Sequence, residues 1–173
     1  MSGAIIICGS AEEGGVTYAM CSSAKAVLEK KGYQVSLFHP SDMDLHHCRD
    51  CKGCAQGECI IEDEMSSIYR SFSESDLIVL ASPIHFSGPS SILKMVMDRF
   101  QPYWCNKDLT HPDYCISMLC GGNKQPNFQI TETIIRAFCL TTGMEYRGSL
   151  QIPDTDSGVS DLEDRVEKFL SVW

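Results

Sequence analysis

The sequence predicts one doubly wound α/β domain over residues 1–173, with a five-stranded parallel sheet and helices on both faces. Short apolar runs alternate with segments of helical period five times along the chain, as they do in successive βα units. The apolar runs lack alternating polar residues, which is typical of parallel strands covered on both faces. No linker, repeat or low-complexity stretch divides the chain, and 173 residues are too few for two ordinary domains.

The first half of the chain is expected to supply two strands and two helices. Ala4–Cys8 is an unbroken, largely β-branched run that predicts the first strand, and Gln34–Phe38 predicts the second. Thr17 is expected to cap the helix between them, which ends before Gly32. A Cys-rich loop at about residues 46–60 precedes the second helix. The apolar faces of the two helices are Met20, Ala24, Val27 and Leu28, and then Met65, Ile68, Tyr69 and Phe72.

The second half is expected to continue the alternation with three strands and three helices. Leu77–Ala81, Tyr114–Leu119 and Glu145–Ile152 predict the strands, the first of them ending at Ser82-Pro83. Ser90 is expected to open one helix and Gly143 to end the next. The apolar faces of the three helices are Leu93, Val96, Met97 and Phe100; Ile130, Ile134, Ala137 and Phe138; and Leu162, Val166, Phe169 and Leu170.

Composition and charge exclude two classes of partner. The net charge is −9 and the pI is near 4.9, so most of the surface repels a phosphate backbone and no nucleic-acid partner is expected. Uncharged apolar runs reach about five residues, against about 20 for a membrane-spanning helix, so no membrane partner is expected. The first residues lack the pattern of a signal peptide, and we expect a cytoplasmic protein.

Three loops are expected to form the functional site, because ligands of doubly wound sheets bind at the carboxyl ends of the strands. They span residues 9–17, 83–89 and 120–127 and are rich in Gly, Ser, Pro or Asn. The first offers a phosphate the backbone N–H groups of a helix N-terminus and the hydroxyls of Ser10 and Thr17. It matches neither a dinucleotide-binding nor a Walker A loop, so it favours a phosphomonoester, although a plain strand-to-helix turn can look similar.

The loop after the third strand carries a more specific motif. It reads Ser-Pro-Ile-His-Phe-Ser-Gly-Pro-Ser over residues 82–90 and is followed by Lys94 and Asp98-Arg99. Asp63-Glu64-Met65 lies upstream, and Gly121-Gly122 follows the fourth strand. Over most of the chain this series of motifs resembles the NAD(P)H-dependent FMN reductase family of flavodoxin-like proteins.

The resemblance implies bound FMN, with NAD(P)H as a co-substrate. It assigns the FMN phosphate to Ser10, Gly14, Gly15, Val16 and Thr17, and the ring to Pro83, Ile84, His85, Phe86, Gly121 and Gly122. His85 stands where the family often has Tyr. Lys94, Asp98 and Arg99 are expected to form structural ion pairs or oligomer contacts rather than to touch substrate.

One departure from the family concerns the phosphate loop. Relatives often carry Arg or Lys where this chain has Ala11-Glu12-Glu13. Two carboxylates near a phosphate dianion cost on the order of 1 kcal/mol in water, so weak FMN binding is expected.

Four of the ten cysteines are crowded into residues 48–59 in the spacing C-x2-C-x2-C-x4-C. This compact spacing favours an iron–sulfur cluster over structural zinc, which usually takes two separated pairs; zinc and free or redox-active thiols remain open. The arrangement resembles that of the iron–sulfur flavoproteins, a subgroup of the family, and so implies a 4Fe–4S cluster bound by Cys48, Cys51, Cys54 and Cys59. His46 and His47 are expected outside the ligand set. The other six cysteines are expected to act as small hydrophobic residues: Cys8, Cys21, Cys105, Cys115, Cys120 and Cys139.

The two resemblances together imply an FMN-dependent oxidoreductase that passes electrons between a 4Fe–4S cluster and FMN to an acceptor. Ferredoxin or NAD(P)H would be the electron donor, and a homodimer or homotetramer would bring cluster and flavin together. One alternative is a cluster-free NAD(P)H-dependent FMN or quinone reductase, and another is a non-enzymatic flavodoxin-like carrier or interaction domain. The sequence shows no Ser-His-Asp or paired-carboxylate arrangement, so no side chain is assigned as a catalytic acid or base.

Overall fold

The computed structural model describes residues 2–173 and contains the predicted parallel sheet. Its five parallel strands lie in the order β2-β1-β3-β5-β6. They are β1 (Gly3–Cys8), β2 (Gln34–Phe38), β3 (Leu77–His85), β5 (Tyr114–Cys120) and β6 (Glu145–Ile152). This strand order is that of flavodoxin-like domains, in which the topological switch lies beside the first strand.

A sixth, two-residue strand corrects the predicted five-stranded sheet. β4 (Gly88–Pro89) pairs antiparallel with the end of β3, where Ile84 lies opposite Pro89 and His85 opposite Gly88. β3 therefore continues beyond Ala81, where the sequence predicted its end. Phe86 and Ser87 close the hairpin with φ angles of 50° and 65°, as a two-residue type I′ turn requires.

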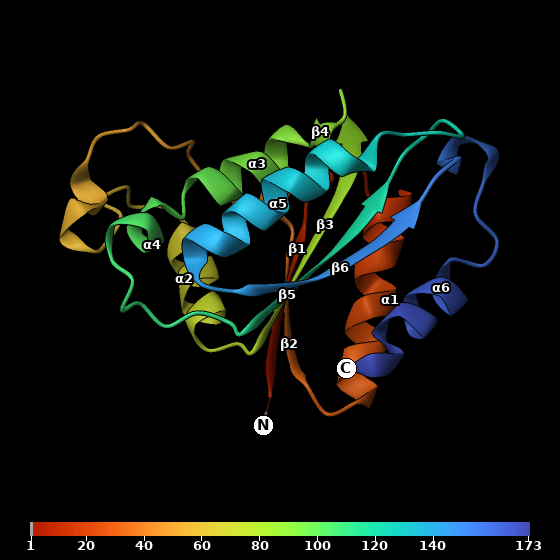
Figure 1. The fold of residues 1–173 in the computed structure, drawn as a ribbon, viewed down its shortest axis with the longest axis horizontal. Coiled ribbons are helices and arrows are strands. Elements are labelled where there is room, and N and C mark those ends of the chain that lie inside the picture. Colours follow the sequence, from red (N-terminus) through yellow and green to blue (C-terminus); the bar gives the residue numbers. More distant parts are fainter. Residues whose placement is uncertain (1) are drawn as a thin grey trace.

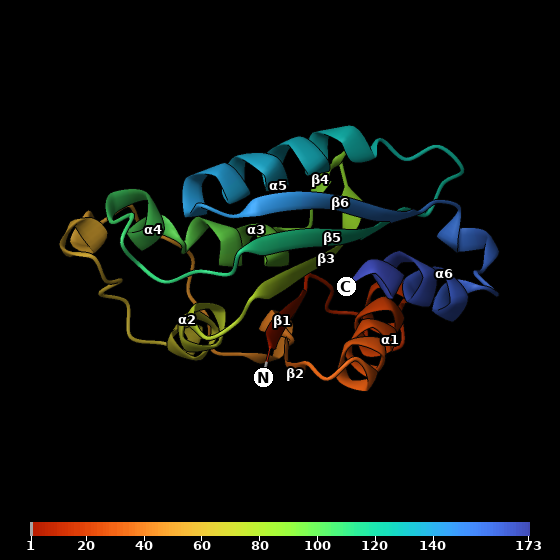
Figure 2. The ribbon, with the colours of Figure 1, turned by 60° about the horizontal axis from the view of Figure 1, so that its bottom comes forward.

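Helices cover both faces of the sheet, as predicted (Figures 1 and 2). Figure 2 shows α1 and α5 on opposite sides of the strands. The first face is covered by α1 (Val16–Lys30) and α6 (Leu162–Phe169). The second is covered by α2 (Met65–Ser73), α3 (Ser91–Asp98) and α5 (Phe128–Thr142), with α4 (Gln101–Cys105) packed against α5. None of the helices described in residues 2–173 combines the length and the apolar character needed to cross a membrane.

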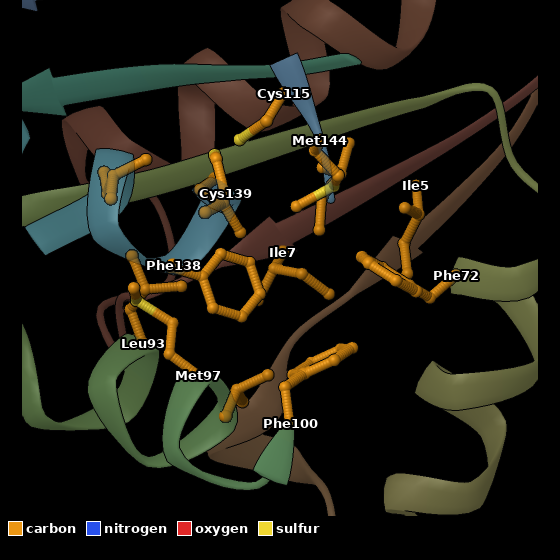
Figure 3. Close-up of a cluster of buried hydrophobic side chains, with 14 of the residues drawn as sticks. Ile5, Ile7, Phe72, Leu93, Met97, Phe100, Cys115, Phe138, Cys139 and Met144 are labelled. Atoms are coloured by element: carbon orange, nitrogen blue, oxygen red, sulfur yellow. The ribbon is translucent and has the colours of Figure 1, made fainter. Parts of the chain in front are cut away.

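Side chains of β1 alternate between two cores. Ile5 and Ile7 lie in the core beneath α2, α3 and α5, whereas Ala4, Ile6 and Cys8 lie in the core beneath α1 and α6. Figure 3 shows the first core, where Phe72, Phe100 and Phe138 gather around Ile7. Phe100 contacts the other two rings at centroid distances of 4.7 and 5.3 Å.

Three details of the predicted helices are wrong. Gly15, and not Thr17, is the N-cap residue of α1, and Thr17 is buried inside the helix. The buried face of α5 includes Phe128 and Ile135, whereas the predicted face residues Ile130 and Ala137 are exposed, Ile130 by 47%. The short helix α4 was not predicted; it begins at Gln101-Pro102, directly after Phe100.

Candidate functional site

A cleft of about 630 Å³ lies at the carboxyl ends of the strands, where the sequence predicted the site. All but one of the residues assigned to FMN line it: Ser10, Gly14, Gly15, Val16, Thr17, Pro83, Ile84, His85, Gly121 and Gly122. Phe86 is the exception, because it is fully exposed at the tip of the β3–β4 turn and does not line the cleft. The three predicted loops are thus brought together, while the identity of the ligand stays a prediction.

Hydrogen bonds of Ser82 and Ser90 lock the walls of this cleft together. The Ser90 hydroxyl caps α3 by accepting from the N–H of Leu93 at 3.1 Å, and it donates to the carbonyl of Gly9 at 2.5 Å. The Ser90 N–H donates to the hydroxyl of Ser82 at 2.9 Å. A Cβ on Gly9 would lie 2.7 Å from the carbonyl oxygen of Ala81, so this close approach of β1 and β3 requires glycine.

The loop between β1 and α1 leaves backbone N–H groups without a side-chain cap and also carries a carboxylate into the cleft. Gly15 offers no side-chain cap to α1, so within the described chain the N–H groups of the first turn stay available to a ligand. The Ser10 hydroxyl accepts from the N–H of Glu12 at 3.2 Å, and Thr17 Oγ1 lies 3.2 Å from Cys120 Sγ. Glu12 lines the cleft, whereas Glu13 does not.

Sequence reasoning missed the residues that the turn after β6 contributes to the cleft. Thr155 and Asp156, from the 3-10 turn after β6, line the cleft. The backbone N–H groups of Thr155 and Asp156 donate to the carbonyls of Gly121 and Gly122 at 3.1 and 3.2 Å. A Cβ on Gly122 would lie 2.6 Å from both carboxylate oxygens of Asp156, so glycine lets this carboxylate lie over the loop. The signal in the sequence is the polar run after the fifth predicted strand, at the edge where ligands bind.

A second cavity, of about 250 Å³, is lined by the crowded cysteines, and we call it the thiol cavity. Its lining includes Cys48, Cys51, Cys54 and Cys59, all from the segment that Figure 1 draws in orange to yellow beside α4. Asp50 and Lys52 have left-handed backbone conformations, with φ of 48° and 63°, and turn the chain on either side of Cys51. Strained conformations of this kind cluster at binding sites.

The donor set of the thiol cavity suits an iron–sulfur cluster, in which each thiolate binds a different iron atom. Among residues 2–173, no three or more His, Cys, Asp or Glu side chains are arranged to hold a single metal ion. The assignment of Cys48, Cys51, Cys54 and Cys59 as cluster ligands stays a prediction.

Cys105 is a fifth cysteine of the thiol cavity and corrects the sequence analysis. It was expected to act as a small buried hydrophobe, but it is exposed and lines the cavity from α4. Burial raises the pKa of the Cys54 thiol, and hydrogen bonding to Cys105 and the negative charges of Cys105 and Cys48 raise it further. The prediction is confirmed for the other five cysteines, which are all buried: Cys8, Cys21, Cys115, Cys120 and Cys139.

Arg99 holds both ends of the Cys-rich loop. Its Nη1 donates to Asp63 Oδ2 at 2.5 Å and to the carbonyl of His46 at 2.7 Å. Its Nη2 donates to Asp63 Oδ1 at 3.0 Å, to the carbonyl of Ile61 at 3.4 Å and to Cys59 Sγ at 3.5 Å. The side chains of Arg99 and Asp63 are 2% and 0% exposed, so the two residues form a buried, bidentate ion pair.

The expected structural ion pairs are thereby confirmed for Lys94, Asp98 and Arg99. Lys94 Nζ lies 2.6 Å from Asp98 Oδ1, and both side chains are about half exposed.

Burial alone would raise the pKa of Asp63, but hydrogen bonds from Arg99, His46 and Met65 and the charge of Arg99 lower it to about 2.

The lowered pKa of Asp63 predicts an acid transition. Its pKa is about 2 in the folded chain against an ordinary 3.8, so its ionised form stabilises the fold above pH 4, and this contribution is lost as the pH falls to 2. The shift corresponds to about 2 kcal/mol of unfolding free energy. We expect urea unfolding at pH 5 and pH 2.5 to show this loss in the wild type and to lack it in Asp63→Asn. The same pH dependence of unfolding in both proteins would show that protonation of Asp63 does not cause the loss of stability in acid.

The helix α3 connects the two cavities. Ser90 and Ser91 at its N-terminus line the cleft, and Arg99 at its C-terminus lines the thiol cavity. In Figure 1 this helix runs from the β4 hairpin towards α4. A helix of eight residues is about 12 Å long. Within one chain the two cavities are therefore separated by roughly the length of α3.

The strand order and the position of the cleft are those of a flavodoxin-like domain. The family model described as NADPH-dependent FMN reductase matches residues 4–139. The chain therefore belongs to the NADPH-dependent FMN reductase family, a family of flavin-dependent oxidoreductases.

Comparison with curated proteins finds relatives whose names are those of the predicted subgroup. An iron–sulfur flavoprotein of Archaeoglobus fulgidus is 35% identical over 101 residues, which cover 58% of this chain and 46% of that protein. An iron–sulfur flavoprotein of Methanocaldococcus jannaschii is 34% identical over 97 residues, 56% of this chain and 50% of that protein. The chain thus spans about half the length of the curated relatives it matches.

Solved structures share the fold at low sequence identity. An NADH:FMN oxidoreductase in its apo form superposes with a TM-score of 0.67 at 17% identity, covering 98% of this chain and 88% of that chain. An FMN-dependent NADH-azoreductase of Bacillus anthracis, solved in complex with FMN, gives a TM-score of 0.68 at 14% identity, covering 98% and 95%. At these identities the likeness shows the flavodoxin-like fold.

Proposed function

We propose that the chain is an FMN-dependent oxidoreductase that uses a 4Fe–4S cluster together with FMN to move electrons from a donor to an acceptor. The observation that carries the proposal is that the cleft at the carboxyl ends of the strands and the thiol cavity lie at the two ends of α3. The family and the names of the curated relatives support it. When bound, FMN supplies one- and two-electron chemistry and the cluster supplies one-electron chemistry, while the protein supplies position and electrostatics.

The residues of the cleft divide into three proposed roles toward FMN. The N–H groups from Gly14 to Thr17, with Ser10, hold the phosphate. Pro83, Ile84 and His85 on one side, and Gly121 and Gly122 on the other, hold the ring. Asp156 also lines the cleft, and its carboxylate can accept hydrogen bonds from ribityl hydroxyls. Phe86 is left outside this set.

The proposed electron donor is NAD(P)H or ferredoxin, and the proposed assembly is a homodimer or homotetramer. The separation of cleft and thiol cavity along α3 is the reason to consider an assembly, because a second chain can bring its cleft to the thiol cavity of the first. Sedimentation of the holoprotein tests this: we expect a species of two or four chains. A monomer with complete electron transfer would contradict it.

An anaerobic reduction experiment tests the proposed function. The chain, loaded with FMN, iron and sulfide, is mixed with NADPH, NADH or reduced ferredoxin, and flavin and cluster absorbance are followed separately. We expect both absorbances to bleach with one of these donors and to recover when an acceptor is added.

Two other outcomes would overturn the proposal in favour of an alternative. Bleaching of flavin by NAD(P)H in a chain that retains no iron would indicate a cluster-free FMN or quinone reductase. Failure to bind FMN would indicate a carrier or interaction domain that shares only the fold.

Removal of the carboxylate that lines the cleft is expected to strengthen FMN binding. Glu12 faces the proposed phosphate site, and a unit charge near a phosphate dianion costs about 1 kcal/mol in water. We expect Glu12→Gln to lower the FMN dissociation constant about five-fold, measured by flavin fluorescence quenching. Glu13→Gln is the matched control, because the neighbouring Glu13 does not line the cleft, and it should change affinity less than two-fold. Equal effects of the two variants would contradict the placement of Glu12.

A further inference from the structure

Arg99 is the buried cation of the thiol cavity. Its side chain is 2% exposed and lines the cavity from the C-terminal end of α3. The other lysine or arginine on the cavity wall, Lys52, has a 78% exposed side chain and pairs with Asp50 at 2.6 Å in solvent. Solvent screens the charge of Lys52 strongly and that of Arg99 weakly.

One N–H group of Arg99 lacks a partner among residues 2–173. Nη1 and Nη2 are satisfied by Asp63, by the carbonyls of His46 and Ile61, and by Cys59 Sγ. Nε is buried and forms no hydrogen bond within the described part of the chain. A buried donor without an acceptor costs about 1–3 kcal/mol, so an acceptor bound within reach of Nε would relieve this cost.

The chemistry of the cavity determines what that acceptor is. The cavity brings together four cysteines of the loop and Cys105, and Arg99 already donates from Nη2 to the sulfur of Cys59. Thiolate and sulfide sulfur atoms accept N–H hydrogen bonds, and such bonds shift the potential of iron–sulfur clusters.

We propose that Arg99 sets the reduction potential of the iron–sulfur cluster, by donating N–H groups to sulfur and by placing a buried positive charge beside it. This inference rests on the proposed function, because it requires a cluster in the thiol cavity. Reduction adds one negative charge to a cluster, and donors and positive charge stabilise the reduced form more than the oxidised form. Arg99 therefore raises the potential, and Asp63, which offsets its charge, limits the rise.

Three variants separate this role from a purely structural one. Arg99→Gln removes the charge and most N–H donors, whereas Arg99→Lys keeps the charge but lacks the planar guanidinium. Asp63→Asn keeps the guanidinium but removes the negative charge that offsets it. Lys94→Gln is the matched control, because Lys94 is a half-exposed cation on the same helix and lines neither the cleft nor the thiol cavity. The full chain is loaded anaerobically with iron and sulfide, and cluster potential is measured by redox titration followed by absorbance and electron paramagnetic resonance.

The two sides of the ion pair are expected to shift the potential in opposite directions. Arg99→Gln lowers it most and Arg99→Lys lowers it less, Asp63→Asn raises it, and Lys94→Gln leaves it unchanged. Before loading, hydrogen exchange of residues 46–61 is expected to accelerate about ten-fold or more in Arg99→Gln, because the loop loses the group that ties its ends.

The results that would overturn the inference are distinguishable from failure of the proposed function. Shifts of the same sign in Arg99→Lys and Asp63→Asn, or a wild-type potential in the iron-loaded Arg99 variants, would leave Arg99 with a structural role only. If the wild-type chain binds no iron, the proposed function fails and this inference fails with it.

Discussion

Replacement of Cys51 by alanine is expected to abolish the iron–sulfur cluster and to leave the fold intact. Cys51 lies in the thiol cavity between two residues of left-handed backbone conformation, in a loop outside the sheet. Its side chain is exposed and contributes nothing to either core, so its loss costs little stability. We expect iron to fall from about four atoms per chain to less than about one. Circular dichroism and thermal unfolding of the two chains, compared without cofactors, are expected to be unchanged.

Cys105 provides the matched control for the ligand assignment. It lines the same cavity and is exposed as Cys51 is, but it lies on α4 and outside the predicted ligand set. Cys105→Ala is therefore expected to retain the full iron and sulfide content. Unchanged iron in Cys51→Ala, or loss of iron in Cys105→Ala, would mean that a different set of thiols binds the cluster.

Removal of the Asp63 carboxylate is expected to cause the largest loss of stability. Asp63→Ala leaves the guanidinium of Arg99 buried without its charged partner, which typically costs about 3–5 kcal/mol. The loss should appear in urea unfolding of the chain without cofactors. It should also release the loop, because the side chain of Asp63 accepts from the N–H groups of His46 and Met65 at 2.9 and 3.1 Å.

Asp98→Ala is the control for this substitution. Asp98 forms an ion pair of similar length with Lys94, but both side chains are about half exposed, so its loss should cost less than about 1 kcal/mol. Similar losses in Asp63→Ala and Asp98→Ala would contradict the description of the Arg99–Asp63 pair as the buried support of the loop.

Most of the fold could be predicted because the central strands β1, β3 and β5 are buried on both faces. A run such as Ala4–Cys8 shows no alternation, but it is short and rich in β-branched residues, which is typical of a buried strand. β4 could not be predicted, since it is only two residues long and its turn uses Phe86 and Ser87 at positive φ, where glycine or asparagine usually marks a turn. The face of α5 was misjudged because apolar residues occur around most of this helix, and packing against the sheet decides which of them are buried.

The residues of the candidate site that lie in one continuous loop could be predicted from the sequence. The residues that tertiary packing brings to the site from elsewhere in the chain could not. The β1–α1 loop and the four crowded cysteines are continuous in sequence and were identified from it. Cys105 reaches the thiol cavity from α4, and no local pattern connects it to that site. Asp156 reaches the cleft from the turn after β6, where a polar run is the only sequence signal. The motif containing Arg99 indicated a structural ion pair, but its partner Asp63 is distant in sequence and only the folded chain brings them together.

The most direct test of the account is the composition of the anaerobically purified chain. Iron, acid-labile sulfide, zinc and FMN are quantified in the same sample, before and after reconstitution with iron and sulfide. We expect about four irons, four sulfides and one FMN per chain, without zinc. FMN without iron or sulfide after reconstitution, or stoichiometric zinc, would contradict the proposed cluster.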